Sequence, residues 1–157
     1  MQIPPLDSTI HNVLAAYDLG KVGSIEAHAG TAGKTWRVRS SQGAWLLRLR
    51  GTRTSAPHLV AYDHGLRAYL LEAGIPTAAP VPTHDGRKCV FTQGRVYELY
   101  TWIEGHCLKS AGASALSQAA HGLARFHQAA ADYVAARELP PVAQYATLGC
   151  QTTSRRM

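Results

Sequence analysis

The residues best suited to chemistry are gathered in one basic stretch of the chain. No acidic residue occurs between Glu26 and Asp63, and six cationic ones do: Lys34, Arg37, Arg39, Arg48, Arg50 and Arg53. The whole 157-residue chain carries a formal charge of +6. A local positive field attracts phosphate, whether of a nucleotide or of a nucleic acid. A solvated basic sheet face would give the same pattern, so both interpretations stay open.

A turn of small residues lies within this stretch. The segment Gly30-Thr31-Ala32-Gly33-Lys34 would let backbone N–H groups approach anionic oxygens closely, although an ordinary hairpin turn would also use it. A phosphate-binding P-loop is not expected. That motif needs Gly at position 28, where His28 stands, and a helix after Thr35, where alternation predicts a strand.

Neither metal chemistry nor nucleophilic catalysis has a recognisable pattern. His106 and Cys107 are adjacent, and His121 and His127 are six apart, so neither pair has the spacing of zinc ligands on a helix. No serine or cysteine has the sequence context of an activated nucleophile. We predict no metal site and no catalytic residue.

Cysteine count and hydropathy indicate the compartment. The three cysteines, Cys89, Cys107 and Cys150, are odd in number and far apart, which favours a reducing compartment over a disulfide framework. The sequence shows no signal peptide and no apolar run long enough for a membrane span. We therefore expect a cytoplasmic protein without a membrane partner.

Hydrophobic periodicity predicts the elements that must position the basic stretch. A helix is expected from Asp7 or Ser8 to Gly20 and another from Pro57 to Ala73, with a long one capped by Ser114. Period-two alternation predicts strands over 22–28, 34–39, 45–50, 88–91 and 95–103. The order indicates an α+β fold in which one helix crosses a five-stranded antiparallel sheet.

The pleat of the third strand sorts its side chains between two faces. Leu46, Arg48 and Arg50 would lie on one face and Trp45, Leu47 and Leu49 on the other.

This order of elements, together with several motifs, resembles the N-terminal lobe of protein-kinase-like enzymes. The group is that of aminoglycoside phosphotransferases, choline kinases and type II homoserine kinases, and the resemblance covers residues 9–135. The motifs are Ala29-Gly30-Thr31-Ala32-Gly33-Lys34-Thr35-Trp36-Arg37-Val38, Trp45-Leu46-Leu47-Arg48-Leu49, the connector 74–82, and Val96-Tyr97-Glu98-Leu99-Tyr100-Thr101-Trp102-Ile103-Glu104-Gly105.

The resemblance implies a nucleotide-binding site. In this site Arg48 would bind phosphate, Asp63 would pair with Arg48, and Leu46 would cover one face of the adenine ring. Two further sets would complete the site: Gly30, Thr31, Ala32, Gly33 and Lys34 over the phosphates, and Tyr100, Thr101, Trp102 and Ile103 along the adenine edge. The family often has Asn where Gly33 stands, and Glu where Asp63 stands.

The catalytic motifs of the family are missing from this sequence. Its H-G-D-x-x-x-x-N loop supplies an acid that orients the acceptor and an Asn that holds magnesium, and a later D-x-D adds a metal ligand. Here the single Asn is Asn12, and the only Asp after Gly105 is Asp132. His121-Gly122-Leu123 begins like the loop but lacks its Asp.

The sequence therefore predicts an ATP-dependent phosphotransferase that is truncated before the catalytic loop, by a frameshift for example, and inactive alone. ATP with Mg²⁺ would be the cofactor of the full-length family, and a small-molecule hydroxyl the acceptor. A separate chain carrying the C-lobe is a candidate partner. We expect the N-lobe over 1–104, the hinge exit and first C-lobe helix over 105–140, and a disordered tail over 141–157.

The alternative is a basic module that binds a nucleotide or a nucleic acid without catalysis. It would need aromatic side chains exposed among the arginines. Alternation places Trp36 and Trp45 inward, which makes nucleic acid the less favoured partner.

Overall fold

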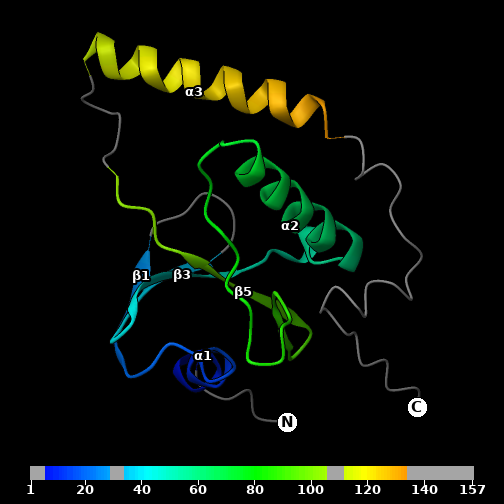
Figure 1. The fold of residues 1–157 in the computed structure, drawn as a ribbon. Coiled ribbons are helices and arrows are strands. Elements are labelled where there is room, and N and C mark those ends of the chain that lie inside the picture. The colour runs from blue at the N-terminus through cyan, green and yellow to red at the C-terminus, as the bar shows by residue number, and fades with distance from the viewer. Residues whose placement is uncertain (1–5, 29–33, 106–111, 134–157) are drawn as a thin grey trace.

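The computed structural model describes residues 6–28, 34–105 and 112–133. Figure 1 shows its helices and strands, whose bounds are α1 Leu6–Leu14, β1 Val22–His28, β2 Lys34–Ser40, β3 Gly43–Leu49, the short 3-10 helix Thr52–Thr54, α2 Pro57–Glu72, β4 Val90–Thr92, β5 Arg95–Thr101 and α3 Ala113–Ala131. The strands form one antiparallel sheet in the order β1-β2-β3-β5-β4. The predicted α+β fold with a five-stranded sheet is confirmed.

Each face of the sheet is covered by one helix, with α1 on one side and α2 on the other (Figure 1). The main core lies on the α1 side, where Ile10, Val13 and Leu14 meet Val38 and Leu47. Trp36 is 7% exposed in this core, and Trp45 packs against it. The alternation predicted for the third strand is therefore confirmed.

Helix α1 is shorter than its sequence pattern predicts. It ends at Leu14 rather than near Gly20. Ala16 and Tyr17 donate backbone hydrogen bonds to Val13 and Leu14, three residues earlier, so the chain tightens into turns. Tyr17 still reaches the core and is 4% exposed.

Local sequence fixes both ends of α2. Pro57 stands in its first turn, where no backbone N–H is needed. At the other end Gly74 has a φ of 71°, and the Ile75 N–H donates to the Leu70 carbonyl at 2.8 Å. The connector that follows runs beside β5, with Val81 N–H donating to the Leu99 carbonyl at 2.8 Å.

Helix α3 lies beyond α2, away from the sheet (Figure 1). None of its residues is buried, and Leu116 and Leu123 are 51% and 56% exposed. Tyr133, just after the helix, packs against Tyr62 and Tyr69 of α2. None of the helices in the described segments combines enough length with enough apolar sequence for a transmembrane span.

The cysteine prediction differs from the structure, and two predicted segments lie outside the described residues. Cys89 is buried beside Val60 and Val96, and it is disulfide-bonded, whereas the cysteine pattern favoured a reducing compartment over a disulfide framework. The turn Gly30–Gly33 and the predicted tail 141–157 lie outside the described residues.

Candidate functional site

A cluster of charged side chains lies between the sheet and α2. It consists of Arg48 on β3, Arg50 just after β3, Asp63, His64 and Arg67 on α2, and Glu98 on β5. Arg48 and Arg50 alternate with Leu47 and Leu49, which point into the α1-side core, so the two arginines face α2. Glu98 is the cross-strand partner of Arg48.

Arg50 makes the closest contacts in this cluster. Its Nη1 donates to Asp63 Oδ2 at 2.9 Å and to Glu98 Oε1 at 2.8 Å, and its Nε donates to the Thr54 carbonyl at 2.8 Å. The side chain is 4% exposed. Burial works against the charge of Arg50, but the charges and hydrogen bonds of Glu98 and Asp63 outweigh it and raise the pKa of the guanidinium.

Arg48 is held more loosely. Its Nη1 lies 3.6 Å from Asp63 Oδ2 and 3.9 Å from Glu98 Oε2, both longer than a hydrogen bond. It makes no side-chain hydrogen bond to any residue in the described part of the chain. The side chain is 19% exposed. Asp63 and Arg48 therefore lie together as an ion pair, but Asp63 is hydrogen-bonded to Arg50.

Glu98 is a fully buried carboxylate, with a side chain 0% exposed. Its Oε1 contacts Arg50 Nη1, and His64 Nε2 lies 2.9 Å from the same oxygen. Its Oε2 accepts no hydrogen bond from a described residue. Burial alone would raise the pKa of Glu98, but the contact with His64 and the charge of Arg50 outweigh burial and hold the pKa below its ordinary value.

The charges of the cluster do not cancel. Arg67 Nε lies 3.5 Å from Asp63 Oδ1, and its guanidinium lies 4.8 Å from the centre of the Tyr100 ring. Three arginines (Arg48, Arg50, Arg67) face two carboxylates (Asp63, Glu98), which leaves one positive charge in excess when His64 is neutral. An anion that reached Arg48 would balance this charge.

Two other predicted site residues join the same face. Leu46 pairs with Tyr100 across β3 and β5, so both lie on the face that carries Arg48. Tyr100 is 2% exposed, and burial raises the pKa of its hydroxyl. Leu46, Arg48, Asp63 and Tyr100 are thus brought together. Lys34 pairs with Leu49, which puts it on the α1 face, whereas Thr35 pairs with Arg48.

The predicted adenine edge lies where β5 leaves the sheet. Thr101 N–H donates to the Ala79 carbonyl at 3.0 Å, and Trp102 N–H donates to the Ala44 carbonyl at 3.2 Å. The guanidinium of Arg37 lies over the Trp102 ring, 4.3 Å from the ring centre. The ring of His28 makes an edge contact with Trp102, with 5.2 Å between the two ring centres. Ile103 is 57% exposed, and its backbone makes no hydrogen bond to another described residue.

Five residues at this face had no predicted individual role in the site: Thr35, Arg50, His64, Arg67 and Glu98. For Arg50 a signal was present, because it stands two residues after Arg48 on the same face of a strand. Glu98 is an acid between the apolar and aromatic residues Tyr97 and Leu99 of β5, and such a residue needs buried partners. His64 and Arg67 reach the cluster only through the placement of α2.

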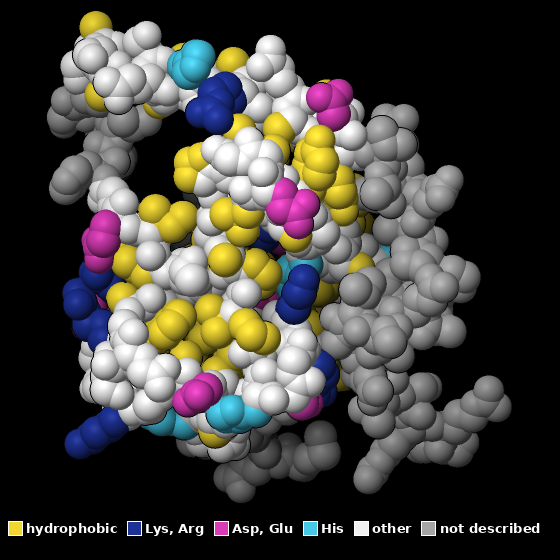
Figure 2. Space-filling model, in the orientation of Figure 1, with side chains coloured by type: hydrophobic (Ala, Val, Ile, Leu, Met, Phe, Trp, Pro, Cys, Tyr) yellow, Lys and Arg dark blue, Asp and Glu magenta, His cyan; other side chains and the backbone are white. Residues whose placement is uncertain are grey.

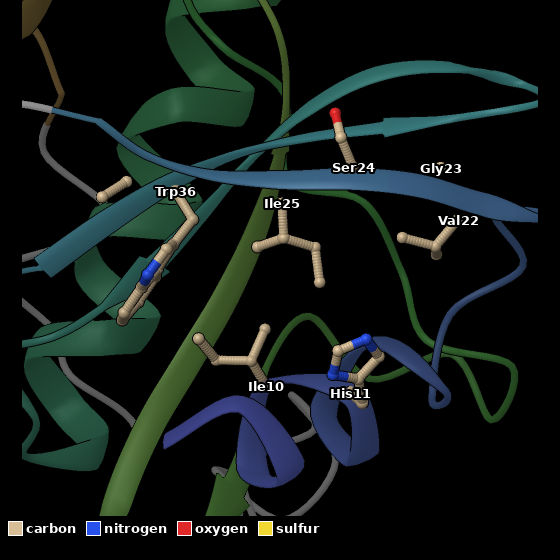
Figure 3. A pocket seen from close by; sticks show the side chains of 8 residues that line it. Ile10, His11, Val22, Gly23, Ser24, Ile25 and Trp36 are labelled. Atoms are coloured by element: carbon tan, nitrogen blue, oxygen red, sulfur yellow. The ribbon is translucent and has the colours of Figure 1, made fainter. Parts of the chain in front are cut away.

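Outside the cluster there is a pocket of about 450 Å³ on the opposite face of the sheet. It lies between α1 and the strands β1 and β2, where Ile10, Ile25 and Trp36 point into it and Ser24 points away (Figure 3). The pocket is therefore separate from the charged cluster. In the described residues no three His, Cys, Asp or Glu side chains are arranged to hold a metal ion.

Basic side chains form no continuous patch on the face of the molecule drawn in Figure 2. On the side of the molecule seen in Figure 2, Lys and Arg side chains are scattered among acidic and hydrophobic ones.

The sequence of the chain is similar to those of known proteins. Residues 24–150 match the family described as "Phosphotransferase enzyme family". Homoserine kinase of Hyphomonas neptunium (strain ATCC 15444) is 29% identical over 133 residues, which are 84% of this chain and 40% of that protein. Homoserine kinase of Rhizobium meliloti (strain 1021) is 30% identical over 117 residues, which are 74% of this chain and 36% of that protein.

Solved structures show the same fold. An amicoumacin kinase in complex with AMP-PNP, Ca²⁺ and Ami superposes with a TM-score of 0.68 at 16% identity, covering 82% of this chain and 41% of that chain. An aminoglycoside phosphotransferase from Alicyclobacillus acidocaldarius gives 0.62 at 22% identity, covering 83% and 36%. The chain thus spans about 40% of the length of the curated relatives and of these structures.

Proposed function

The chain belongs to the phosphotransferase enzyme family, and on that premise we propose that it forms the ATP-binding lobe of a kinase acting on a hydroxyl group of a small molecule. The observation that carries this proposal is the state of Arg48. It is a half-buried guanidinium with no side-chain hydrogen bond to a described residue, in a cluster with one excess positive charge. A phosphate would supply both the missing acceptor and the missing charge.

The end of β5 supports the placement of adenine. Among Thr101, Trp102 and Ile103, the first two already use their backbone N–H groups within the sheet and the connector. Ile103 is left with its backbone groups available in an extended, exposed segment. We propose that Ile103 provides the hydrogen bond to the adenine edge, with Leu46 in apolar contact with the ring and the buried Tyr100 paired beside Leu46.

The remaining roles follow from the same arrangement. The turn Gly30-Thr31-Ala32-Gly33 would cover the phosphates, and Asp63 would brace Arg48 through its charge. Thr35 pairs with Arg48 across the sheet, so its side chain is a further candidate for the phosphate side of the site. Lys34, on the other face, would act only through its charge.

We propose that these 157 residues alone do not transfer phosphate. Positioning and charge neutralisation carry phosphoryl transfer, and both need an acid that orients the acceptor and carboxylates that hold Mg²⁺. The sequence contains neither an H-G-D-x-x-x-x-N nor a D-x-D motif. The residues present do not fit Mg²⁺ by themselves, so the metal and the acceptor would be held by sequence equivalent to the rest of the relatives, in a second chain for example.

The test is nucleotide binding by the 157-residue chain. Isothermal titration with ATP should detect binding, and Arg48→Met should weaken it by about tenfold or more, because a charge-assisted contact to phosphate is lost. Arg95→Met removes one exposed arginine at the far end of β5 and is the matched control, with affinity unchanged. Equal affinity in Arg48→Met and wild type would overturn the role of Arg48.

The nucleic-acid alternative finds no support in the tryptophans. Trp36 is buried in the core and Trp45 packs against it, so neither offers a stacking surface among the arginines. A gel shift with a single-stranded oligonucleotide, lost in Arg48→Ala and unaffected by competing ATP, would revive this alternative.

A further inference from the structure

Arg48 and Arg50 lie beside the same two carboxylates under α2, but at different distances from them. Arg50 holds both carboxylates at hydrogen-bond distance, Asp63 at 2.9 Å and Glu98 at 2.8 Å. Arg48 reaches the same two residues only at 3.6 and 3.9 Å. We infer that Arg50 is a positioning residue that keeps Arg48 available for phosphate by occupying Asp63 and Glu98. The inference rests on the proposed function, in which Arg48 binds the nucleotide.

Glu98 is the acid that would otherwise capture Arg48. The two residues are direct partners across β3 and β5, a position in which opposite charges attract. Glu98 is fully buried, so its charge must be matched by a close cation. Its Oε2 accepts no hydrogen bond from a described residue and already lies 3.9 Å from Arg48 Nη1. Without Arg50, a small move of Arg48 onto this oxygen would give Glu98 a close cation beside its contact with His64.

Arg50 is itself poorly placed to bind a ligand. Its backbone N–H donates to the Val96 carbonyl at 2.9 Å, and its Nε donates to the Thr54 carbonyl. The side chain is 4% exposed, against 19% for Arg48. The two cations therefore have separate tasks: Arg50 neutralises the buried carboxylates, and Arg48 faces the nucleotide.

The experiment compares a single and a double variant of the 157-residue chain. Arg50→Met leaves Arg48 and Arg67 facing Asp63 and Glu98, so the cluster charge falls from +1 to 0. Adding Glu98→Gln restores the cluster to +1, because Arg48 and Arg67 then face Asp63 alone. In ATP titration we expect Arg50→Met to lose about tenfold or more in affinity, and Arg50→Met/Glu98→Gln to return to within about threefold of wild type.

A second measurement follows Arg48 without any nucleotide. In ¹⁵N-labelled protein, the guanidinium signals of Arg48 should exchange and rotate fast in wild type and slow down in Arg50→Met, as the side chain locks onto Glu98. The double variant should return Arg48 to fast motion. A loss of affinity through general destabilisation would leave the Arg48 signals of the folded protein unchanged, so this measurement separates positioning from a purely structural effect.

The outcomes separate this inference from the proposed function. If wild type binds no ATP, the proposed function fails, and the guanidinium signals still decide whether Arg50 controls Arg48. If Arg48 stays as mobile in Arg50→Met as in wild type, the inference is overturned even when ATP binds. Should Arg50→Met fail to fold, the double variant decides: affinity near wild type supports the inference, and a tenfold loss shows that Arg50 contacts phosphate directly.

Discussion

Arg48 and Glu98 stand opposite each other on neighbouring strands, yet their nearest charged atoms are 3.9 Å apart. Opposite charges directly across two strands attract each other, and a charge-assisted hydrogen bond between them would be shorter than this. Here Arg50, which follows the end of β3, reaches back to the other oxygen of Glu98. The position of Arg50 thus leaves Arg50 hydrogen-bonded to both carboxylates and Arg48 with side-chain donors that have no acceptor among the described residues.

The depressed pKa of Glu98 makes a prediction for acid stability. Because the folded protein holds this pKa below its ordinary value of 4.5, the ionised carboxylate stabilises the fold above that pH. This contribution is lost as pH falls from about 4.5 through the lower, folded-state pKa. The free energy of unfolding, measured in urea at several pH values, should decline across this window.

Glu98→Gln is the variant that checks this assignment. It should cost about 1–3 kcal/mol at pH 7, because Arg50 keeps a hydrogen-bond acceptor but loses a charge. Its decline as the pH falls below 4.5 should be shallower than that of wild type. The assignment is wrong if the two proteins lose stability in parallel over this range.

Replacing Gly74 or Gly122 with alanine should change the free energy of unfolding in opposite directions. Gly74 has a φ of 71° at the end of α2, where an added Cβ meets no atom within 4 Å, so only backbone strain counts. We expect Gly74→Ala to cost about 1–2 kcal/mol. Gly122 lies inside α3 without a positive φ and with open space around it, so Gly122→Ala should stabilise the helix by about 0.5–1 kcal/mol. Urea unfolding followed by circular dichroism measures both, and equal signs would contradict the argument.

Sequence patterns predicted the sheet because its constraints are local. Leu47 and Leu49 alternate with Arg48 and Arg50, and this alternation alone separates the core face from the charged face. Pro57 and Gly74 likewise mark the ends of α2 through their own backbone preferences.

The division of roles in the charged cluster could not be predicted in this way. Arg48 and Arg50 have the same residue type and the same face, and only the distances to Asp63 and Glu98 separate them. Those distances depend on how α2 docks on the sheet. The family resemblance pointed to Arg48, and it carried no information on the cation two residues later.

The stack of Arg37 on Trp102 should contribute more than its ion pair. Arg37 Nη2 donates to Glu104 Oε1 at 2.9 Å, but Glu104 is 78% exposed, where such pairs contribute less than about 1 kcal/mol. The guanidinium also lies 4.3 Å from the centre of the Trp102 ring, a contact of about 0.5–2 kcal/mol. Arg37→Met should therefore destabilise the protein more than Glu104→Gln does, with a change in tryptophan fluorescence only in the first. Because Arg37→Met removes both contacts, an equal loss of stability in Glu104→Gln would show that the ion pair dominates.

Gly65 on α2 lies directly beneath the hydroxyl group of Tyr133, which follows α3. The Tyr133 hydroxyl occupies the place that a Cβ on residue 65 would take, and its ring packs against Tyr62 and Tyr69 at 5.8 and 5.2 Å. In a Tyr133→Ala background, Gly65→Ala should stabilise α2 by about 0.5–1 kcal/mol, since alanine is the better helix former. In the wild-type background the added methyl group must displace Tyr133, so the gain should vanish or reverse. A double-mutant cycle by urea unfolding measures the difference, and strict additivity would show that Tyr133 does not pack on Gly65 in solution.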